Sequence, residues 1–250
     1  MKPGNKLKES IGLMRAYAVS YWVPGKSARL KKLYQQFMTK DSLCFDIGSN
    51  FGNRIPVWRK LGAKIVAIEP QPFLFNFLTR KYAKYKDVTV LRGVVSDEMG
   101  TMKLFHNIQN PTLSTTDQSW IKDKAKDPTW GKFKWDTVIE VEAVTLDHLI
   151  ERYGMPDFCK IDVEGAELQV LMGLSQPIKA VSFEYLTIDK ERAISCIDRL
   201  EELGTYEYNW TISEQSRLIS PEWLPAKQMK ITIEKMGGKA ASGDIYGKLQ

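Results

Sequence analysis

The sequence predicts an α/β protein with a doubly wound, mostly parallel sheet, a helical extension at its N-terminus and one long inserted loop. Three observations predict this fold class. From residue 42 onward, short apolar runs that suit buried strands alternate with amphipathic stretches of helical length. One such stretch begins with Pro72, and proline suits the first turn of a helix. The alternation is interrupted once, by a loop of about thirty residues between His106 and Thr137.

The individual elements are predicted in order from these patterns. Strands 43–48, 64–70 and 88–95 alternate with helices 54–62 and 72–85, a rhythm that favours parallel strands. The remaining elements are strands 100–107 and 138–146, helix 146–154, strand 157–162, helix 165–174, strand 178–186, helix 190–204, and strands 205–212 and 243–249.

The domain organisation follows from the charge and the continuity of these elements. No repeat or linker divides them, so residues 41–250 are predicted to form one domain and residues 1–40 a basic helical extension. The extension holds nine Lys or Arg and one acid, so the net charge of +6 divides into +8 for residues 1–40 and −2 for the rest. Because the body is not basic and carries no nucleic-acid-binding motif, we expect no nucleic-acid partner.

Two further features concern the surroundings of the protein. The apolar stretch 11–23 contains Arg15 and is too short to cross a bilayer, so a helix packed on the domain is favoured over a membrane-surface anchor. The three cysteines form no CxxC pair, and Cys44 and Cys159 lie in apolar runs. Core thiols of this kind indicate a reducing compartment, and we expect the cytoplasm.

A ligand site is predicted where the first strand ends. Asp46 is followed by a turn with two glycines, Gly48 and Gly52, at the place where doubly wound sheets bind ligands. Asn50 stands where a dinucleotide fingerprint needs its second glycine. Glu69 ends the second strand 21 residues after Gly48, where an acid binds ribose hydroxyls in this topology. A ribose-bearing ligand with a cationic amino-acid head is favoured, and S-adenosyl-L-methionine fits that description.

Two other functions stay open at this point. One is an NAD(P)-dependent oxidoreductase, and Asn50 in place of the glycine speaks against it. The other is a non-catalytic module that keeps the fold as a binding scaffold. The combination of Asp46, Glu69 and Asp162 speaks against that second alternative.

Four segments of the chain resemble the FkbM family of S-adenosyl-L-methionine-dependent methyltransferases. They are FDIGSNFGN from Phe45, AIEPQP from Ala67, LRGVVSDEMG from Leu91, and Thr145–Leu174, which contains KIDVEG. The resemblance spans roughly residues 42–185. It implies a Rossmann-like class I methyltransferase fold and transfer of a methyl group, usually to a hydroxyl oxygen of a small molecule such as a sugar.

The resemblance also implies which residues bind the cofactor. Glu69 would bind the ribose, with Pro70 and Gln71 at its border. Asp46, Gly48 and Asn50 would line the methionine moiety, and Gly52 of the same turn is counted with the cofactor-binding residues. Val95 and Ser96 would border the adenine, and Asp97 would either take its exocyclic amine or serve as a turn residue.

Catalytic candidates follow from the fourth main strand, 157–162, which should lie beside the first. An acceptor alcohol has to lose its proton, and Asp162 is the first candidate for the base or for the group that positions the acceptor. Glu164 comes next, although an acid in the first turn of a helix explains it equally well. Lys160 would keep Asp162 ionised or bind an acidic substrate. No metal site is expected, because no histidine or third carboxylate stands at ligand spacing.

The long loop is rich in tryptophan. Trp120, Trp130 and Trp135 suit either a lid that stacks on a sugar or side chains that pack the loop onto the sheet. His106, at the start of this loop, is a further candidate for the base.

Overall fold

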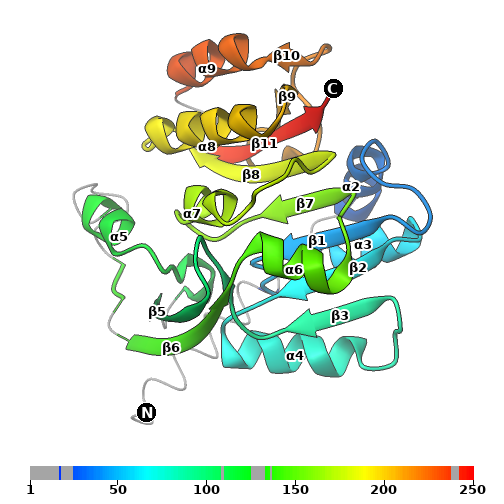
Figure 1. Cartoon of the computed structure of the whole chain (residues 1–250), viewed down its shortest axis with the longest axis vertical. Coiled ribbons are helices and arrows are strands. Elements are labelled where there is room, and N and C mark those ends of the chain that lie inside the picture. Colours follow the sequence, from blue (N-terminus) through cyan, green and yellow to red (C-terminus); the bar gives the residue numbers. More distant parts are fainter. Residues whose placement is uncertain (1–16, 18–24, 108–109, 125–132, 136, 238–241) are drawn as a thin grey trace.

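An eight-stranded sheet runs through the molecule in the order β10-β9-β11-β8-β7-β1-β2-β3 (Figure 1). The computed structural model describes residue 17 and residues 25–107, 110–124, 133–135, 137–237 and 242–250. The five strands from β8 to β3 are parallel, and β11 is antiparallel to both of its neighbours. The strands of this sheet are β1 Leu43–Ile47, β2 Lys64–Ile68, β3 Val88–Leu91, β7 Phe158–Ile161, β8 Ala180–Leu186, β9 Tyr206–Trp210, β10 Leu224–Pro225 and β11 Ser242–Leu249. The predicted α/β class with a mostly parallel sheet is confirmed.

Helices cover both faces of the sheet, as a doubly wound topology requires. One apolar core joins the sheet to α6 Leu146–Tyr153, α7 Glu167–Met172, α8 Lys190–Leu203 and α9 Ala226–Lys235. A second core joins the other face to α2 Lys26–Tyr34, α3 Ile55–Lys60 and α4 Pro72–Tyr82. The predicted helices of the body are confirmed, whereas α9 and the short β10 had no counterpart among the predicted elements.

A second, three-stranded sheet stands apart from the first and has the order β4-β6-β5. It consists of β4 Val94–Val95, β5 Gly100–His106 and β6 Thr137–Val144. The single strand predicted over 88–95 is therefore wrong, because the chain leaves the main sheet after Leu91. Gly93 makes the crossing possible: its φ is +155° and a Cβ there would lie 2.8 Å from the Glu142 carbonyl oxygen.

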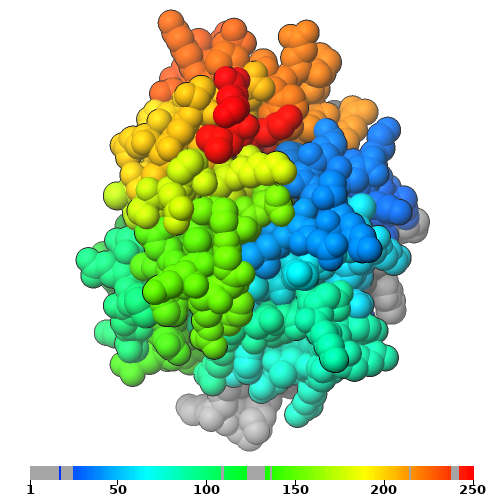
Figure 2. Space-filling view, turned by 45° about the vertical axis from the view of Figure 1, so that its right-hand side comes forward, coloured from blue at the N-terminus to red at the C-terminus, as the bar shows by residue number. Residues whose placement is uncertain are grey.

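The described part of the basic N-terminal segment is packed on the domain. Leu30, Leu33 and Phe37 belong to the second core, and the Phe37 ring stacks on Phe158 at 5.2 Å and on Tyr246 at 5.3 Å between centroids. Figure 2 shows this segment, in blue, against the yellow and red segments from the C-terminal part of the chain. Most of the stretch 11–23 lies outside the described residues. No helix in the described ranges is long and apolar enough to cross a membrane.

Candidate functional site

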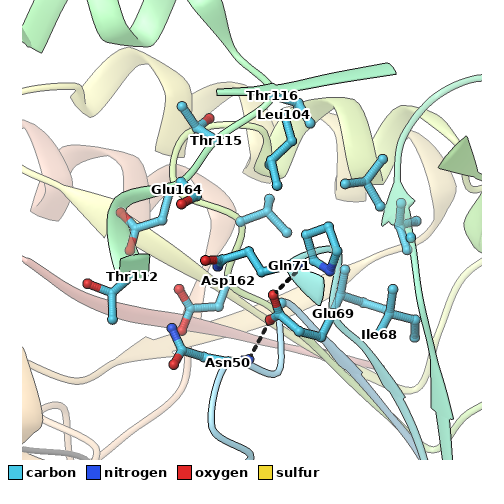
Figure 3. A pocket seen from close by; sticks show the side chains of 18 of the residues that line it. Asn50, Ile68, Glu69, Gln71, Leu104, Thr112, Thr115, Thr116, Asp162 and Glu164 are labelled. Carbon is cyan, nitrogen blue, oxygen red and sulfur yellow. Dashed lines mark hydrogen bonds between the residues drawn. The ribbon is translucent and has the colours of Figure 1, made fainter. Parts of the chain in front are cut away.

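A cavity of about 220 Å³ opens at the carboxyl ends of β1, β2 and β7 (Figure 3). Polar backbone and side-chain groups at the ends of these three strands line one side of the cavity. Chain from the small sheet and from the loop after β5 contributes Val94, Val95, Leu104, Thr112, Ser114, Thr115 and Thr116. The long loop thus closes over the ligand site that the sequence placed at the end of the first strand.

The turn after β1 lets two strand ends approach each other. Gly48 has φ +78°, and a Cβ there would lie 1.9 Å from the Asp162 carbonyl oxygen. Any side chain at this position would therefore push β1 and β7 apart. Gly52 has φ +67° and faces the side chains of Leu78 and Ile55, not the cavity. Its contribution is close packing of the turn against the helices, and not contact with a ligand.

Glu69 is the best-defined polar group of the cavity. Its side chain is 2% exposed, and its two carboxylate oxygens accept the N–H of Asn50 at 2.8 Å and of Gln71 at 2.9 Å (dashed in Figure 3). Burial raises the pKa of Glu69 to about 7, although these two N–H bonds oppose the shift. A carboxylate has about four acceptor positions, so Glu69 can accept further bonds from a ligand besides these two.

Besides Gly52, three residues predicted to contact the cofactor lie outside the cavity lining: Asp46, Ser96 and Asp97. Asp46 is buried behind it, and neither of its oxygens has a hydrogen-bond partner in the described part of the chain. Burial raises the pKa of Asp46 despite the nearby cations Arg54 and Lys160. Ser96 and Asp97 bond each other at 2.8 Å, and the Ser96 carbonyl packs against Gly173 at the end of α7. Val95, Pro70 and Gln71 do line the cavity.

Asp162 is tied into a network of charges at the other end of the cavity, to the left of Glu69 in Figure 3. Its Oδ2 accepts bonds from Arg54 and from Lys160, both at 3.2 Å. Lys160 is fully buried and also donates to Asp244 at 2.8 Å. Burial raises the pKa of Asp162, but the two cations outweigh it and lower that pKa below its usual value. The bond from Lys160 favours the ionised form of Asp162, and Lys160 is absent from the lining of this cavity.

Glu184 on β8, which no sequence motif singles out, completes the site. Carboxylate oxygens of Asp162, Glu164 and Glu184 all lie within 4.8 Å of one another. Burial raises the pKa of Glu184 well above its usual value, and the negative charges of Glu164 and Asp162 add to the shift. The signal for Glu184 was an acid near the end of an apolar strand, next in the sheet to the strand that ends at Asp162.

This third carboxylate removes the reason for expecting no metal site. The expectation rested on the lack of a third acid at ligand spacing along the sequence, and Glu184 supplies one in space. The spacing suits a divalent cation, although clustered carboxylates are also found without one. The absence of a metal stays a prediction.

The turn that contains Glu164 and Gly165 packs against a side chain that does not line the cavity, Trp120. Glu164 has φ +54° and precedes α7, whose first-turn acid is Glu167 and not Glu164. Gly165 has φ +101°, and a Cβ there would lie 2.3 Å from the ring of Trp120. Trp120 comes from the short helix α5 Gln118–Lys124 and is 1% exposed.

The two tryptophans of the loop that the structure describes pack against protein. Trp120 meets Trp135 edge to face with centroids 5.8 Å apart, and Trp135 donates to the Leu113 carbonyl at 2.6 Å. Trp120 and Trp135 therefore pack the loop against the protein and do not form an open stacking surface. Trp130 lies outside the described residues. His106 contacts Ser114 at 3.0 Å and does not line the cavity.

Comparisons with known proteins point to one family. A family model described as the methyltransferase FkbM domain matches residues 46–204, more than half of the chain. The chain is 29% identical over 202 residues to methyltransferase sdnD of Sordaria araneosa, covering 66% of this chain and 76% of that protein. It is 25% identical over 152 residues to the hexuronic acid methyltransferase AglP of Haloferax volcanii, covering 60% of this chain and 56% of that protein. A solved O-methyltransferase from Bacillus cereus in complex with SAH is 13% identical, covers 100% of this chain and 92% of its own, and has a TM-score of 0.47.

Proposed function

Since the chain belongs to the FkbM methyltransferase domain family, we propose that it transfers a methyl group from S-adenosyl-L-methionine to a hydroxyl oxygen of a sugar or another small metabolite. When bound, the cofactor supplies a methyl group on a positively charged sulfur. The chain has to bind that cofactor, orient an acceptor oxygen towards the methyl group, exclude water and remove the acceptor's proton.

The observation that carries the cofactor assignment is Glu69. Two backbone N–H groups fix its carboxylate in a buried wall of the cavity, and a carboxylate accepts two vicinal ribose hydroxyls with strong charge-assisted bonds. Ile68, Val95 and Leu104 line the same cavity with apolar side chains that suit a planar base. The carboxylates at the opposite end, Asp162 and Glu164, suit the positive charges of the methionine moiety.

The acceptor assignment is supported by the polar lining of the site and by one relative. AglP is named a hexuronic acid methyltransferase, and this name supports a sugar derivative as the acceptor class proposed here. The three cysteines are all buried and free, which suits the reducing cytoplasm that we propose as the location.

Replacement of Glu69 tests the cofactor assignment. Glu69→Ala should lower the affinity for S-adenosylhomocysteine by about 1.5–3 kcal/mol, the range for hydrogen bonds to a charged group. Titration calorimetry measures this, with Glu98→Ala as a matched control because Glu98 is exposed and lines no cavity. Unchanged affinity in a folded Glu69→Ala variant, or tighter binding of NAD(P) than of S-adenosylhomocysteine by the unaltered protein, would contradict the proposal.

A further inference from the structure

A second cavity, of about 160 Å³, adjoins the cofactor cavity on the side of α2 and β11. Asn53, Arg54, Asp162 and Glu184 line both cavities, and we call these four residues the shared wall. Molecules bound in the two cavities would therefore meet at the same side chains. Two reactants that exchange a group have to meet in this way.

The second cavity has the lining of a site for a polyhydroxylated molecule. Its charged side chains are Lys26 and Arg54 against three carboxylates, Asp162, Glu184 and Asp244, so it offers no excess of positive charge for a phosphate. Carboxylates and hydroxyls pair well with vicinal hydroxyl groups. The hydroxyl-bearing residues are Tyr34, Thr211, Ser213, Ser216, Ser242 and Tyr246.

An apolar strip completes this lining. Leu30 and Leu33 reach the cavity from α2, beside the ring of Tyr34. A pyranose ring has polar edges and apolar C–H faces, so a cavity with both kinds of wall fits it better than a purely polar or purely apolar one.

Two carboxylates of the shared wall, Asp162 and Glu184, could remove the acceptor's proton. They differ in their hydrogen-bond and ion-pair partners. Asp162 accepts bonds from two cations on one oxygen and is stabilised as an anion. A carboxylate stabilised in this way is a weak base. The Asp162 side chain therefore positions groups at the wall, and its proton affinity is too low for efficient transfer.

The Glu184 carboxylate lacks the stabilising bonds that Asp162 receives. No hydrogen bond or ion pair joins its carboxylate to another residue in the described ranges. It is partly buried, faces the carboxylates of Glu164, Asp162 and Glu167, and has Lys160 as the opposing cation. These surroundings raise the proton affinity of Glu184 above that of Asp162, and the positive charge of a bound cofactor would favour the ionised form that can take a proton.

We propose that the second cavity binds a carbohydrate-like, polyhydroxylated acceptor and that Glu184 is the catalytic residue that takes the proton of the methylated hydroxyl. This inference rests on the proposed function. The bond between methyl carbon and sulfur breaks as the bond between methyl carbon and acceptor oxygen forms, the sulfur keeps the electron pair, and the hydroxyl proton passes to a Glu184 carboxylate oxygen. Charge balances, because the cationic sulfur and the anionic carboxylate both become neutral.

The test uses Glu184→Gln, which preserves shape and removes the charge. We expect the single-turnover rate of methyl transfer to fall by about 10²–10⁴, the usual contribution of general acid–base catalysis, while the dissociation constant of S-adenosylhomocysteine stays within about twofold. Glu140→Gln is the matched control, because it removes the same charge from an exposed position on β6. The acceptor probes are the methyl glycosides of glucose, galactose, mannose, glucuronic acid and galacturonic acid.

A second variant tests the cavity itself. Ser242→Phe narrows the second cavity. It should raise the KM for the glycoside that serves as methyl acceptor at least tenfold, without changing the affinity for S-adenosylhomocysteine. A Glu184→Gln rate equal to that of the unaltered protein would overturn the role of Glu184. So would activity that EDTA abolishes and Mg²⁺ restores, because the three carboxylates would then bind a metal.

The remaining outcomes separate this inference from the function on which it rests. Binding of S-adenosylhomocysteine without methylation of any of the five glycosides overturns the acceptor class and leaves the cofactor assignment intact. Failure to bind S-adenosylhomocysteine overturns the proposed function itself.

Discussion

Glu69 holds its proton more tightly in the cofactor-free protein than an ordinary carboxyl group. Burial raises its pKa to about 7, so that it is only partly ionised near neutral pH. Ribose hydroxyls that donate to it favour the ionised form. Binding of a ribose-bearing cofactor should therefore expel a proton from this residue.

This proton release is measurable by calorimetry. At pH about 6, the observed enthalpy of S-adenosylhomocysteine binding should vary with the ionisation enthalpy of the buffer, because the buffer takes up the proton released by Glu69. Glu69→Gln should remove most of that variation. A binding enthalpy that is the same in phosphate and in imidazole-type buffers would show that Glu69 does not titrate on binding.

The same residue makes stability depend on pH. Its pKa in the folded protein, about 7, exceeds the ordinary value of 4.5 for a glutamate, so its contribution to stability is fully present below pH about 4.5 and is lost as pH rises through about 7. With about 1.4 kcal/mol per pKa unit, the loss is roughly 3 kcal/mol. Urea unfolding of the cofactor-free protein at pH 5 and pH 8 should show this difference, and it should be smaller in Glu69→Gln. An equal pH dependence in the two proteins would contradict it.

At the scale of elements, α5 packs over the turn that carries Glu164. Trp120 fills the space over Gly165, and Arg192 of α8 joins Asp117, just before α5, at 3.0 Å and also donates to the Gly165 carbonyl. The turn that carries Glu164 is thus fixed by contacts from two helices.

Removal of the Trp120 ring should loosen this turn. Trp120→Ala should lower the free energy of unfolding by about 3–5 kcal/mol, as expected for a fully buried aromatic side chain, and should reduce turnover more than cofactor affinity. Urea unfolding measures the first effect, and Met99→Ala, at an exposed site, is the control. Wild-type stability of Trp120→Ala would mean that α5 does not fix the turn.

Some elements of this fold can be predicted from local sequence patterns and others cannot, for a physical reason. Strands 43–48 and 157–162 and the helices after them have strong local patterns, so they could be predicted, and with them the neighbourhood of Gly48, Glu69 and Asp162. Helix α9 buries only Met229 and Ile233, a pattern too weak to see locally. Glu184 and the second cavity depend on packing between distant segments, which no local pattern contains.

At the scale of the whole molecule, helix α2 presents positive charge at the surface but no exposed apolar face. Leu30, Leu33 and Tyr34 are buried in the core, while Lys31 and Lys32 are exposed. A helix that binds a membrane surface needs an accessible apolar face.

We therefore expect no stable association with lipid through α2. In sedimentation with phosphatidylserine-containing vesicles at about 0.15 M salt, the protein should stay in the supernatant, and any binding at low salt should disappear as salt screens the charges. Lys31→Glu together with Lys32→Glu should weaken the low-salt binding further. Sedimentation that persists at 1 M salt would contradict this expectation.

The two cavities are lined by different segments of the sequence. Every residue that lines the cofactor cavity falls between Ile47 and Glu184, inside the region that the family model matches, residues 46–204. Most of the second cavity comes from outside that region: Lys26, Leu30, Leu33 and Tyr34 before it, and Thr211, Ser213, Ser216, Ser242, Gly243, Asp244 and Tyr246 after it. If the two cavities bind donor and acceptor as proposed, the matched region determines donor binding, and the segments before and after it determine acceptor preference. Chimeras that swap residues 25–40 and 205–250 between family members should inherit the acceptor preference of the end segments while their donor affinity stays that of the central module.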